Sequence, residues 1–322
     1  MKRMKIIRRT GIALFVLLLI AGGYFYLHPV NCFRAQMYLS EFLHGEASHS
    51  VVVDGNRIHY LEAGPSAGPQ LVLVHGLGGS TEDWRELTPA LARAGFHVYM
   101  PDLLGYGRSA RPASFTYAVR DEAEFVARFM DAMGIRQADV GGWSMGGGIV
   151  QHLAFRHPQR VRRLILFDSA GLWERPQWDV QLFTPQSPAE LGALNSLLMP
   201  SPPPVPGFVA DDVLRGSRAN AWVIHRALEA MLTGQDATDK ILPQLKMPVL
   251  IVWGTRDRIL PIEQGRKMQS LLPDGQLLTV EGCGHLAPVQ CPEKILPGLI
   301  EFLRAPDRQG TGGAHPTYNG ER

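Results

Sequence analysis

The sequence predicts an α/β fold in which helices cover both faces of a mostly parallel β-sheet. Three observations predict this architecture and the segments added to it. Short, continuous apolar runs alternate with helical stretches, the pattern of parallel strands buried on both faces. A Pro-rich segment interrupts the alternation and predicts a helical cap inserted between two strands, over the carboxyl edge of the sheet. A basic and then apolar N-terminus predicts a membrane helix ahead of the fold.

The composition is that of an ordinary globular protein. The chain has 322 residues, of which 45% are hydrophobic and 19% charged, and its formal net charge is +2. This length is enough for one large domain with a well-filled core. Because the overall charge is so small, the sequence predicts no nucleic-acid partner.

The basic residues are concentrated at the N-terminus, where residues 1–10 contain several Lys and Arg and no acid. Residues 11–27 carry no charge, and their number is at the short end for a membrane-spanning helix. Tyr24 and Tyr26 fall where interfacial aromatic residues belong. We expect a signal anchor with the basic head in the cytoplasm and the bulk of the protein on the non-cytoplasmic side. A cleaved signal peptide is the alternative.

The elements of the fold begin with a hairpin over Val51–Leu61 that turns at residues 54–56. Further strands are expected at Leu71–Val74, His97–Met100, Ala138–Gly141, Leu164–Phe167, Val249–Val252 and Gln276–Val280. Helices are expected near Trp84–Ala94, Thr116–Met133, Met145–His157, Ile262–Leu272 and Glu293–Arg304, with Ala189–Leu198 and Ala219–Leu232 in the cap.

These elements predict six segments along the chain. They are a basic cytoplasmic head (1–10), a transmembrane anchor (11–27), a connector (28–50), an α/β core (51–171 and 243–304), a cap (172–242) and a disordered tail (305–322). The connector is expected to contain a short amphipathic helix around Phe33–Leu43.

The three cysteines, Cys32, Cys283 and Cys291, are too few for a disulfide framework. Cys283 and Cys291 would form a bridge in an oxidising compartment, or would stay as two small buried thiols. No pair of cysteines has the spacing of metal ligands, and the sequence predicts no metal site.

The segment Gly142-Trp143-Ser144-Met145-Gly146 follows a predicted strand and opens a predicted helix. At so tight a turn the positions around the serine must lack side chains, which explains the glycines two residues before and after it. The helix start also directs free N–H groups at the turn. We therefore predict Ser144 as a catalytic nucleophile and Trp143 as a substrate-binding residue, the alternative being a serine that only caps a helix.

A Gly-rich turn, residues 75–79, follows the strand Leu71–Val74 and allows a backbone N–H to point into the site. The amides of Leu77 and Met145 are expected to form an oxyanion hole, in which the loss of one donor typically costs about 100- to 1,000-fold in rate. Asp102, after the next strand, is interpreted as structural, bracing the turn beneath the site.

His285 follows the last predicted strand in a Gly-rich loop that can bring its ring back over the sheet. Asp257 follows Val249–Val252 and can reach an imidazole at the same sheet edge. Nucleophile, acid and base then occur in one of the known chain orders of a Ser-His-Asp triad. We predict His285 as the base and Asp257 as the acid, with Asp168 as the rival acid.

Over residues 50–304 the sequence resembles the α/β-hydrolase superfamily, on the motifs around His75, Asp102, Ser144, Asp257 and His285. A closer likeness is to membrane-anchored monoacylglycerol lipases and related bacterial lipases. The motifs shared with them are Ser-Met-Gly-Gly (144–147), Ala-Gly-Leu (170–172), Trp-Gly-x-x-Asp (253–257) and Cys-Gly-His (283–285). The resemblance implies hydrolysis of acylglycerols or similar lipid esters without a cofactor. Trp143 departs from the family, where His, Asn, Thr or Tyr often precedes the serine.

Two other functions fit the same motifs. A carbon–carbon bond hydrolase of ring-cleavage products would share the triad and the turn around the serine, and an inactive hydrolase fold would serve only for binding. The N-terminal anchor favours a lipid or small-molecule ester as substrate. Apolar cap residues are expected to line an acyl tunnel or to form the cap's own core: Leu182, Phe183, Leu191, Leu194, Leu197, Leu198, Met199, Phe208, Val209 and Trp222.

Overall fold

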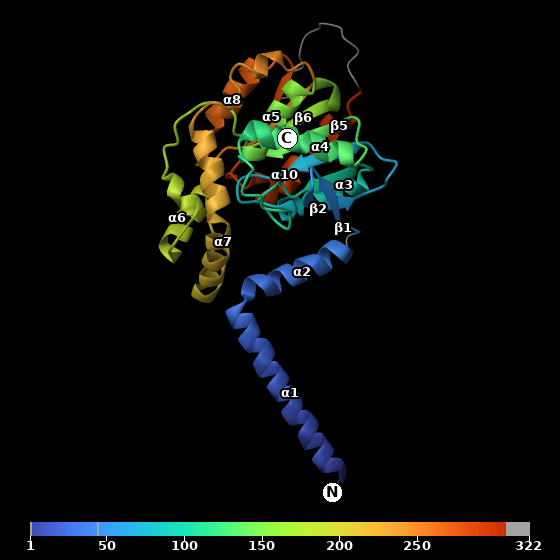
Figure 1. Ribbon diagram of the computed structural model, residues 1–322, viewed down its shortest axis with the longest axis vertical. Coiled ribbons are helices and arrows are strands. Elements are labelled where there is room, and N and C mark those ends of the chain that lie inside the picture. Colours follow the sequence, from blue (N-terminus) through green and yellow to red (C-terminus); the bar gives the residue numbers. More distant parts are fainter. Residues whose placement is uncertain (1, 44, 307–322) are drawn as a thin grey trace.

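In the part of the chain that the computed structural model describes, residues 2–43 and 45–306, eight strands form one sheet (Figure 1). Their spatial order is β1-β2-β4-β3-β5-β6-β7-β8. The pairs β1–β2 and β2–β4 are antiparallel and all others are parallel. The strands are β1 (Ala47–Val53), β2 (Asn56–Ala63), β3 (Gln70–Val74), β4 (His97–Pro101), β5 (Ala138–Trp143), β6 (Val161–Phe167), β7 (Val249–Gly254) and β8 (Gly275–Val280).

Helices cover both faces of the sheet because the strands point apolar side chains to both sides. Val72 and Val74 of β3 pack in one core with α4, α5 and α8, whereas Leu71 and Leu73 pack on the other face with α3 and α10. These helices are α3 (Thr88–Arg93), α4 (Val119–Ala132), α5 (Met145–Arg156), α8 (Ile262–Leu271), α9 (Ala287–Gln290) and α10 (Pro292–Arg304). Short 3₁₀ turns lie at Thr81–Trp84, Pro158–Arg160, Val180–Phe183 and Leu242–Gln244.

The first strand begins earlier than the sequence predicts. β1 starts at Ala47, within the expected connector, and pairs with β2 from Ala47↔Glu62 to Val53↔Asn56. Most of its side chains are exposed, so no alternation of apolar and polar residues marks its first half. Backbone pairing with β2, rather than burial, defines its extent.

The insertion between β6 and β7 contains two helices, α6 (Pro188–Leu198) and α7 (Gly207–Leu232). They lie side by side at one side of the sheet in Figure 1, with α7 reaching toward the N-terminal helices. α7 begins well before the expected Ala219. Its first half contains Asp211, Asp212 and Arg215 together with the weak helix formers Gly207 and Gly216, and these residues weaken the helical signal in the sequence.

Two helices precede the sheet, α1 (Lys2–Leu27) and α2 (Pro29–Leu43). Pro29 lacks an N–H and disfavours a helical conformation at the residue before it, which explains why α1 ends at Leu27. The helix α2 packs against the fold through the buried Met37 and through Arg108, whose guanidinium lies 4.4 Å from the centroid of the Tyr38 ring. The expected connector helix is thus present and begins at Pro29 rather than Phe33.

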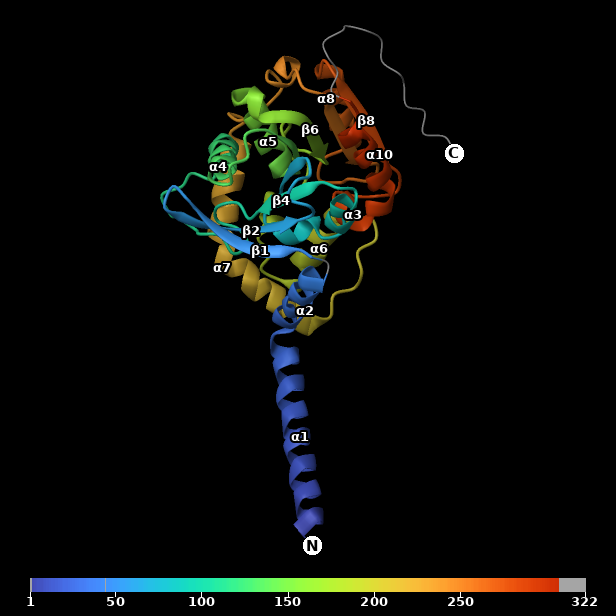
Figure 2. The ribbon, with the colours of Figure 1, turned by 90° about the vertical axis from the view of Figure 1, so that its right-hand side faces the viewer.

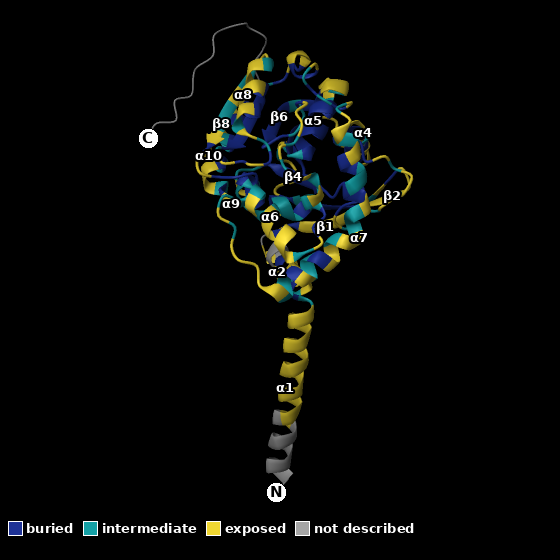
Figure 3. Ribbon diagram, turned by 90° about the vertical axis from the view of Figure 1, so that its left-hand side faces the viewer, coloured by how far each residue is buried: buried dark blue, intermediate teal, exposed yellow. Residues whose placement is uncertain are grey.

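The helix α1 projects away from the α/β fold, and the side chains described along it are exposed (Figures 2 and 3). Within the described residues, no single helix combines the length and the apolar character needed to cross a membrane, so residues 11–27 alone do not meet the expectation of a spanning anchor. Ile12–Leu27 and Pro29–Leu39 pass that test only together, as a pair bent by 100°. A signal sequence would pass it too.

The C-terminal tail was expected to be disordered over residues 305–322. Residues 307–322 lie outside the described residues. Within the described part, Ala305 donates its amide to Phe302 at the end of α10 and accepts a hydrogen bond from Arg163.

Cys283 and Cys291 form a disulfide bond, so of the two alternatives for this pair the structure has the bridge. Cys32 is a free, half-buried thiol on α2.

Candidate active site

Ser144 lies in the turn between β5 and α5 with a φ of 54°. A side chain on either nearby glycine would clash with backbone, because a Cβ on Gly142 would lie 2.2 Å from the Gly146 oxygen and one on Gly146 would lie 2.3 Å from the Val74 oxygen. The strained φ is held in part by the Ser144 amide, which donates to Phe167 at the end of β6. The local sequence therefore folds as its glycine spacing predicts.

Ser144, His285 and Asp257 are joined by two hydrogen bonds. Oγ of Ser144 lies 2.9 Å from Nε2 of His285, and Nδ1 of His285 lies 2.7 Å from Oδ2 of Asp257. The side chains of His285 and Asp257 are almost fully buried. Oδ1 of Asp257 accepts hydrogen bonds from the amides of Ile259 and Leu260, which fix the carboxylate. This arrangement can transfer the serine proton to the imidazole and stabilise the imidazolium.

Asp168, the rival acid, makes a different contact. Its Oδ1 accepts a hydrogen bond from the amide of Gly254, and its Oδ2 has no hydrogen-bond partner among the described residues. Burial, together with the negative charge of Asp257, raises the pKa of Asp168 well above its ordinary value. A carboxyl whose charged form is disfavoured in this way, and which is bonded to Gly254 while Nδ1 of His285 is bonded to Asp257, is poorly suited to support an imidazolium.

The amides of Leu77 and Met145 are both available to a bound oxyanion. Among residues 2–43 and 45–306, neither amide donates to a backbone or side-chain acceptor. A Cβ on Gly76 would lie 3.2 Å from Cβ of Ser144, so the Gly-rich turn runs directly beside the nucleophile. Leu77 also lines the cavity above Ser144. The geometry is compatible with the predicted oxyanion hole, which stays a prediction.

Trp143 lines the cavity but also makes a contact that the sequence did not predict. Its indole Nε1 donates a hydrogen bond of 2.9 Å to the backbone oxygen of His285, and the two ring centroids are 5.9 Å apart. The side chain is 7% exposed. Trp143 therefore connects the serine turn to the histidine loop, in addition to any contact with substrate.

Asp102 is a buried brace, as interpreted from the sequence. Its carboxylate accepts hydrogen bonds from the amides of Thr81 and Arg108 and contacts Nδ1 of His59 at 2.7 Å. Burial raises the pKa of this carboxyl, but the contacts with His59 and other donors outweigh it, and the pKa lies below its ordinary value. The charge thus stays fixed beneath the Gly-rich turn.

A cavity of about 700 Å³ lies above Ser144 and His285. One part of its wall is apolar and comes from the cap, through Phe183, Leu191, Leu194 and Leu198. Of the ten cap residues named from the sequence, only these four line the cavity, so the other six do not belong to its wall. Among the described residues no cluster of His, Cys, Asp or Glu could hold a metal ion.

Another part of this wall could not be predicted from the sequence. Val30, Asn31 and Arg34 of α2 line the cavity, and so does Asp83 from the 3₁₀ turn after the Gly-rich segment. Residues 30 and 34 are one helical turn apart, but nothing in their pattern indicates that α2 would pack against a site formed more than a hundred residues later. The amide of Val30 donates to Asp212 of α7, which holds α2 against the cap.

Comparison with known protein families shows to which family this chain belongs. The model of the alpha/beta hydrolase fold family matches residues 69–215 and 226–290. The chain belongs to this family. Lipase 1 of Psychrobacter immobilis is 30% identical over 260 residues, which cover 76% of this chain and 80% of the lipase. The crystal structure of a bacterial membrane phospholipase A superposes with a TM-score of 0.79 at 31% identity, covering 92% of this chain and 98% of that one.

A member of another functional class is also similar. The 2-hydroxymuconate semialdehyde hydrolase of a Pseudomonas strain is 29% identical over 278 residues, which cover 81% of this chain and 95% of that enzyme. The chain is therefore a hydrolase-fold protein related to lipases and a phospholipase, with the 2-hydroxymuconate semialdehyde hydrolase at slightly lower identity.

Proposed function

We propose that this protein is a serine hydrolase of carboxylic esters, acting on acylglycerols or other lipid esters through an acyl-enzyme on Ser144. The observation that carries the proposal is the continuous hydrogen-bonded series from Ser144 through His285 to Asp257, at the base of a large cavity. The similarity to Lipase 1 and to the membrane phospholipase A supports an ester of a lipid as substrate.

The reaction follows from these positions. His285 takes the proton of Ser144 as Oγ attacks the acyl carbon, and Asp257 stabilises the imidazolium. The negative charge of the tetrahedral intermediate faces the amides of Leu77 and Met145. His285 then gives the proton to the departing alcohol, and a water molecule activated in the same way releases the acid and regenerates Ser144.

A lipid substrate suits the apolar wall of the cavity. Phe183, Leu191, Leu194 and Leu198 offer apolar contacts for an acyl chain, and burial of each CH₂ there contributes about 0.8 kcal/mol. The carboxyl edge of the parallel strands presents Ser144 to this wall. The alcohol half of the ester would then face α2 and α7.

We also propose that the N-terminal helices attach the protein to a membrane, with the hydrolase fold on the non-cytoplasmic side. The exposed apolar surface of α1, including Phe15, Leu17 and Leu18, supports attachment. The basic residues ahead of it support a cytoplasmic N-terminus. The Cys283–Cys291 bridge supports an oxidising compartment for the fold. Protease protection in sealed vesicles, with and without detergent, measures this orientation directly.

The function is tested by hydrolysis of p-nitrophenyl esters, of mono-, di- and triacylglycerols and of phospholipids by the purified protein, with Ser144→Ala as the control. We expect turnover of at least one lipid ester and covalent labelling of Ser144 by a fluorophosphonate. Absence of both turnover and labelling would mean that the fold serves only for binding.

The second candidate is a carbon–carbon bond hydrolase, favoured by the similarity to the 2-hydroxymuconate semialdehyde hydrolase. Such an enzyme uses a ring-cleavage dienoate as substrate. Cleavage of that dienoate without hydrolysis of p-nitrophenyl butyrate would decide for this candidate and against the ester hydrolase.

A further inference from the structure

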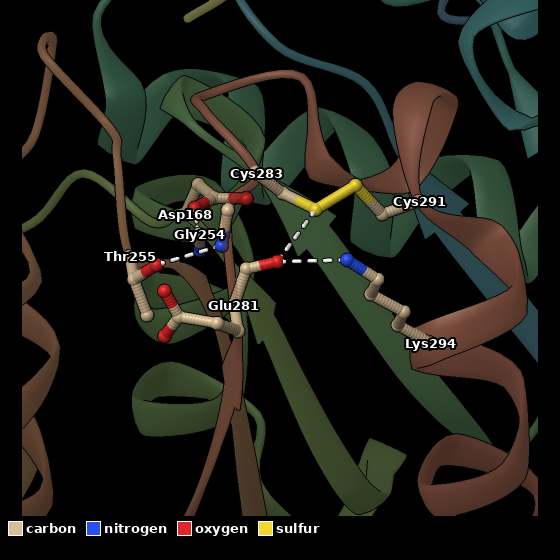
Figure 4. The surroundings of a disulfide bond; sticks show 8 residues. Asp168, Gly254, Thr255, Glu281, Cys283, Cys291 and Lys294 are labelled. Carbon is tan, nitrogen blue, oxygen red and sulfur yellow. Dashed lines mark hydrogen bonds between the residues drawn. A yellow bond between two sulfur atoms is a disulfide. The ribbon is translucent and has the colours of Figure 1, made fainter.

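The disulfide joins the two ends of the loop that carries His285. Cys283 lies just after β8, two residues before His285, and Cys291 lies directly before α10. Figure 4 shows the bond between the two cysteines. Both cysteines are buried, in the same apolar core as Ile295 and Leu299 of α10. The bridge therefore ties the start of the histidine loop to a helix that is itself packed on the sheet.

The loop is tied to the acid as well as to α10. The backbone oxygen of Cys283 accepts a hydrogen bond of 2.8 Å from the amide of Arg256, which directly precedes Asp257. The amide of Gly282 donates to Oγ1 of Thr255 at 3.0 Å, and Nζ of Lys294 donates to the backbone oxygen of Glu281 at 2.8 Å (Figure 4). Movement of Cys283 would therefore alter the position of the acid turn and of the base together.

The nucleophile is connected to the same loop by Trp143. Its indole N–H donates to the backbone oxygen of His285, while its own backbone is continuous with Ser144. The ring lies in the apolar core that also contains both cysteines. The side chain of Trp143 thus links the backbone of His285 to the turn that carries Ser144. This link is separate from the hydrogen bond between the side chains of Ser144 and His285.

We propose that the Cys283–Cys291 disulfide and the Trp143 indole act as positioning groups, which together hold the His285 ring within reach of Ser144 during turnover. The inference rests on the proposed function, since His285 needs a fixed position only if it transfers the serine proton. A displacement of about 1 Å in such a group can lower the rate about 100-fold. Loss of either restraint therefore slows the chemical step rather than substrate binding.

The test uses the full-length protein in which Cys32 is replaced by Ser, so that Cys283 and Cys291 are the remaining cysteines. One variant adds Cys283→Ser and Cys291→Ser, and a second adds Trp143→Phe, which keeps a ring but removes the N–H. Trp222→Phe, on the cap and outside the cavity wall, is the matched control for a Trp-to-Phe change. For each protein, kcat and KM for p-nitrophenyl butyrate, the Tm and the rate of fluorophosphonate labelling are measured.

We expect kcat and the labelling rate to fall about 10- to 100-fold in both variants, with KM within about twofold of the parent. The parent should lose activity on reduction of the bridge with dithiothreitol and regain it on reoxidation. The variant that combines both changes should lose more of its kcat, on a logarithmic scale, than the two separate losses added together. Each restraint still holds the loop in part when the other is absent. Trp222→Phe should leave kcat unchanged.

Two results would overturn the proposal. One is an unchanged kcat with a lowered Tm, because the bridge would then only stabilise the fold. The other is a raised KM with an unchanged kcat in Trp143→Phe, which would make Trp143 a substrate contact alone.

Hydrogen exchange across residues 283–291 gives a readout that does not depend on activity. If the parent protein hydrolyses no ester, the proposed function fails, but faster exchange in both variants would still support the restraint. Equal exchange in the parent and both variants would refute it.

Discussion

Nδ1 of His285 lies 2.7 Å from Oδ2 of Asp257, and the opposite ring nitrogen lies 2.9 Å from Oγ of Ser144. The imidazole is therefore bonded on one side to a fixed, buried carboxylate and on the other to a hydroxyl at the floor of the cavity.

Replacing Ser144 or His285 by Ala should each lower kcat for p-nitrophenyl butyrate about 10⁴-fold or more, because the attacking oxygen or its base is lost. Both residues lie at the cavity floor rather than in the main apolar cores, so the Tm should change by only a few degrees. A residual activity within tenfold of the parent would show that another residue is the nucleophile or the base.

Asp257→Asn and Asp168→Asn form a matched pair of isosteric changes. Asp257→Asn should lower kcat about 10⁴-fold, because the amide favours the wrong tautomer of His285. Asp168→Asn should lower it less than tenfold, because the carboxyl of Asp168 accepts from the Gly254 amide, whereas Nδ1 of His285 is bonded to Asp257. Steady-state kinetics of the two variants, measured side by side, check the assignment. The reverse order of severity would make Asp168 the acid.

Leu194→Trp should shift the preference of the enzyme toward short acyl chains. Leu194 lines the cavity, and a larger side chain there shortens the space for the acyl group. The ratio of kcat/KM for p-nitrophenyl laurate to that for p-nitrophenyl butyrate should fall at least about tenfold. Leu197→Trp, on the same helix but outside the cavity wall, is the control. The same shift in both variants would argue against an acyl site at α6.

Asp83→Asn should flatten the dependence of stability on pH. Burial, followed by the charges of Glu82 and Asp102, raises the pKa of Asp83 from 3.8 to about 7, although the Ser80 amide acts in the opposite direction. The folded protein keeps a proton that the unfolded chain loses between about pH 4 and 7. The stability contributed by this group therefore falls as the pH rises through that range and stays at its lower value above it.

Thermal unfolding between pH 4 and 8 measures this effect. Relative to the parent, Asp83→Asn should gain stability most at pH 7 to 8 and least near pH 4. Asp211→Asn, at an exposed position on α7, serves as the control and should follow the parent. A pH profile of Asp83→Asn parallel to that of the parent would contradict the prediction.

The buried elements of the fold could be read from the sequence because their side chains carry the signal. All residues of β7 are buried, and its apolar run marks it without any knowledge of its neighbours. β1 is mostly exposed, and its first residues have no such signal. The first half of α7 carries charged residues and two glycines, and its helical signal is weak as well.

In the candidate site, too, some residues could be predicted from the sequence and others could not. Ser144 could be identified locally, because the glycines on both sides of it are a steric requirement of its own turn. The roles of Arg34 and Asp83 in the cavity wall could not, because a single charged residue in a helix or turn usually lies on a solvated face. Only packing of α2 beside the site makes Arg34 part of the wall.

The sequence by itself determined how strands and helices follow one another along the chain. It also determined the turn around Ser144 and the positions of His285 and Asp257 after separate strands. These features depend on residues that are neighbours in the chain, whose periodicity and glycine spacing are fixed before folding. The tertiary structure decided that Asp257 rather than Asp168 contacts His285, that Cys283 and Cys291 are bridged, and that the Trp143 indole bonds to His285. Those contacts join residues from different strands and loops, and their distances depend on how the strands are ordered in the sheet and how the loops leave its edge.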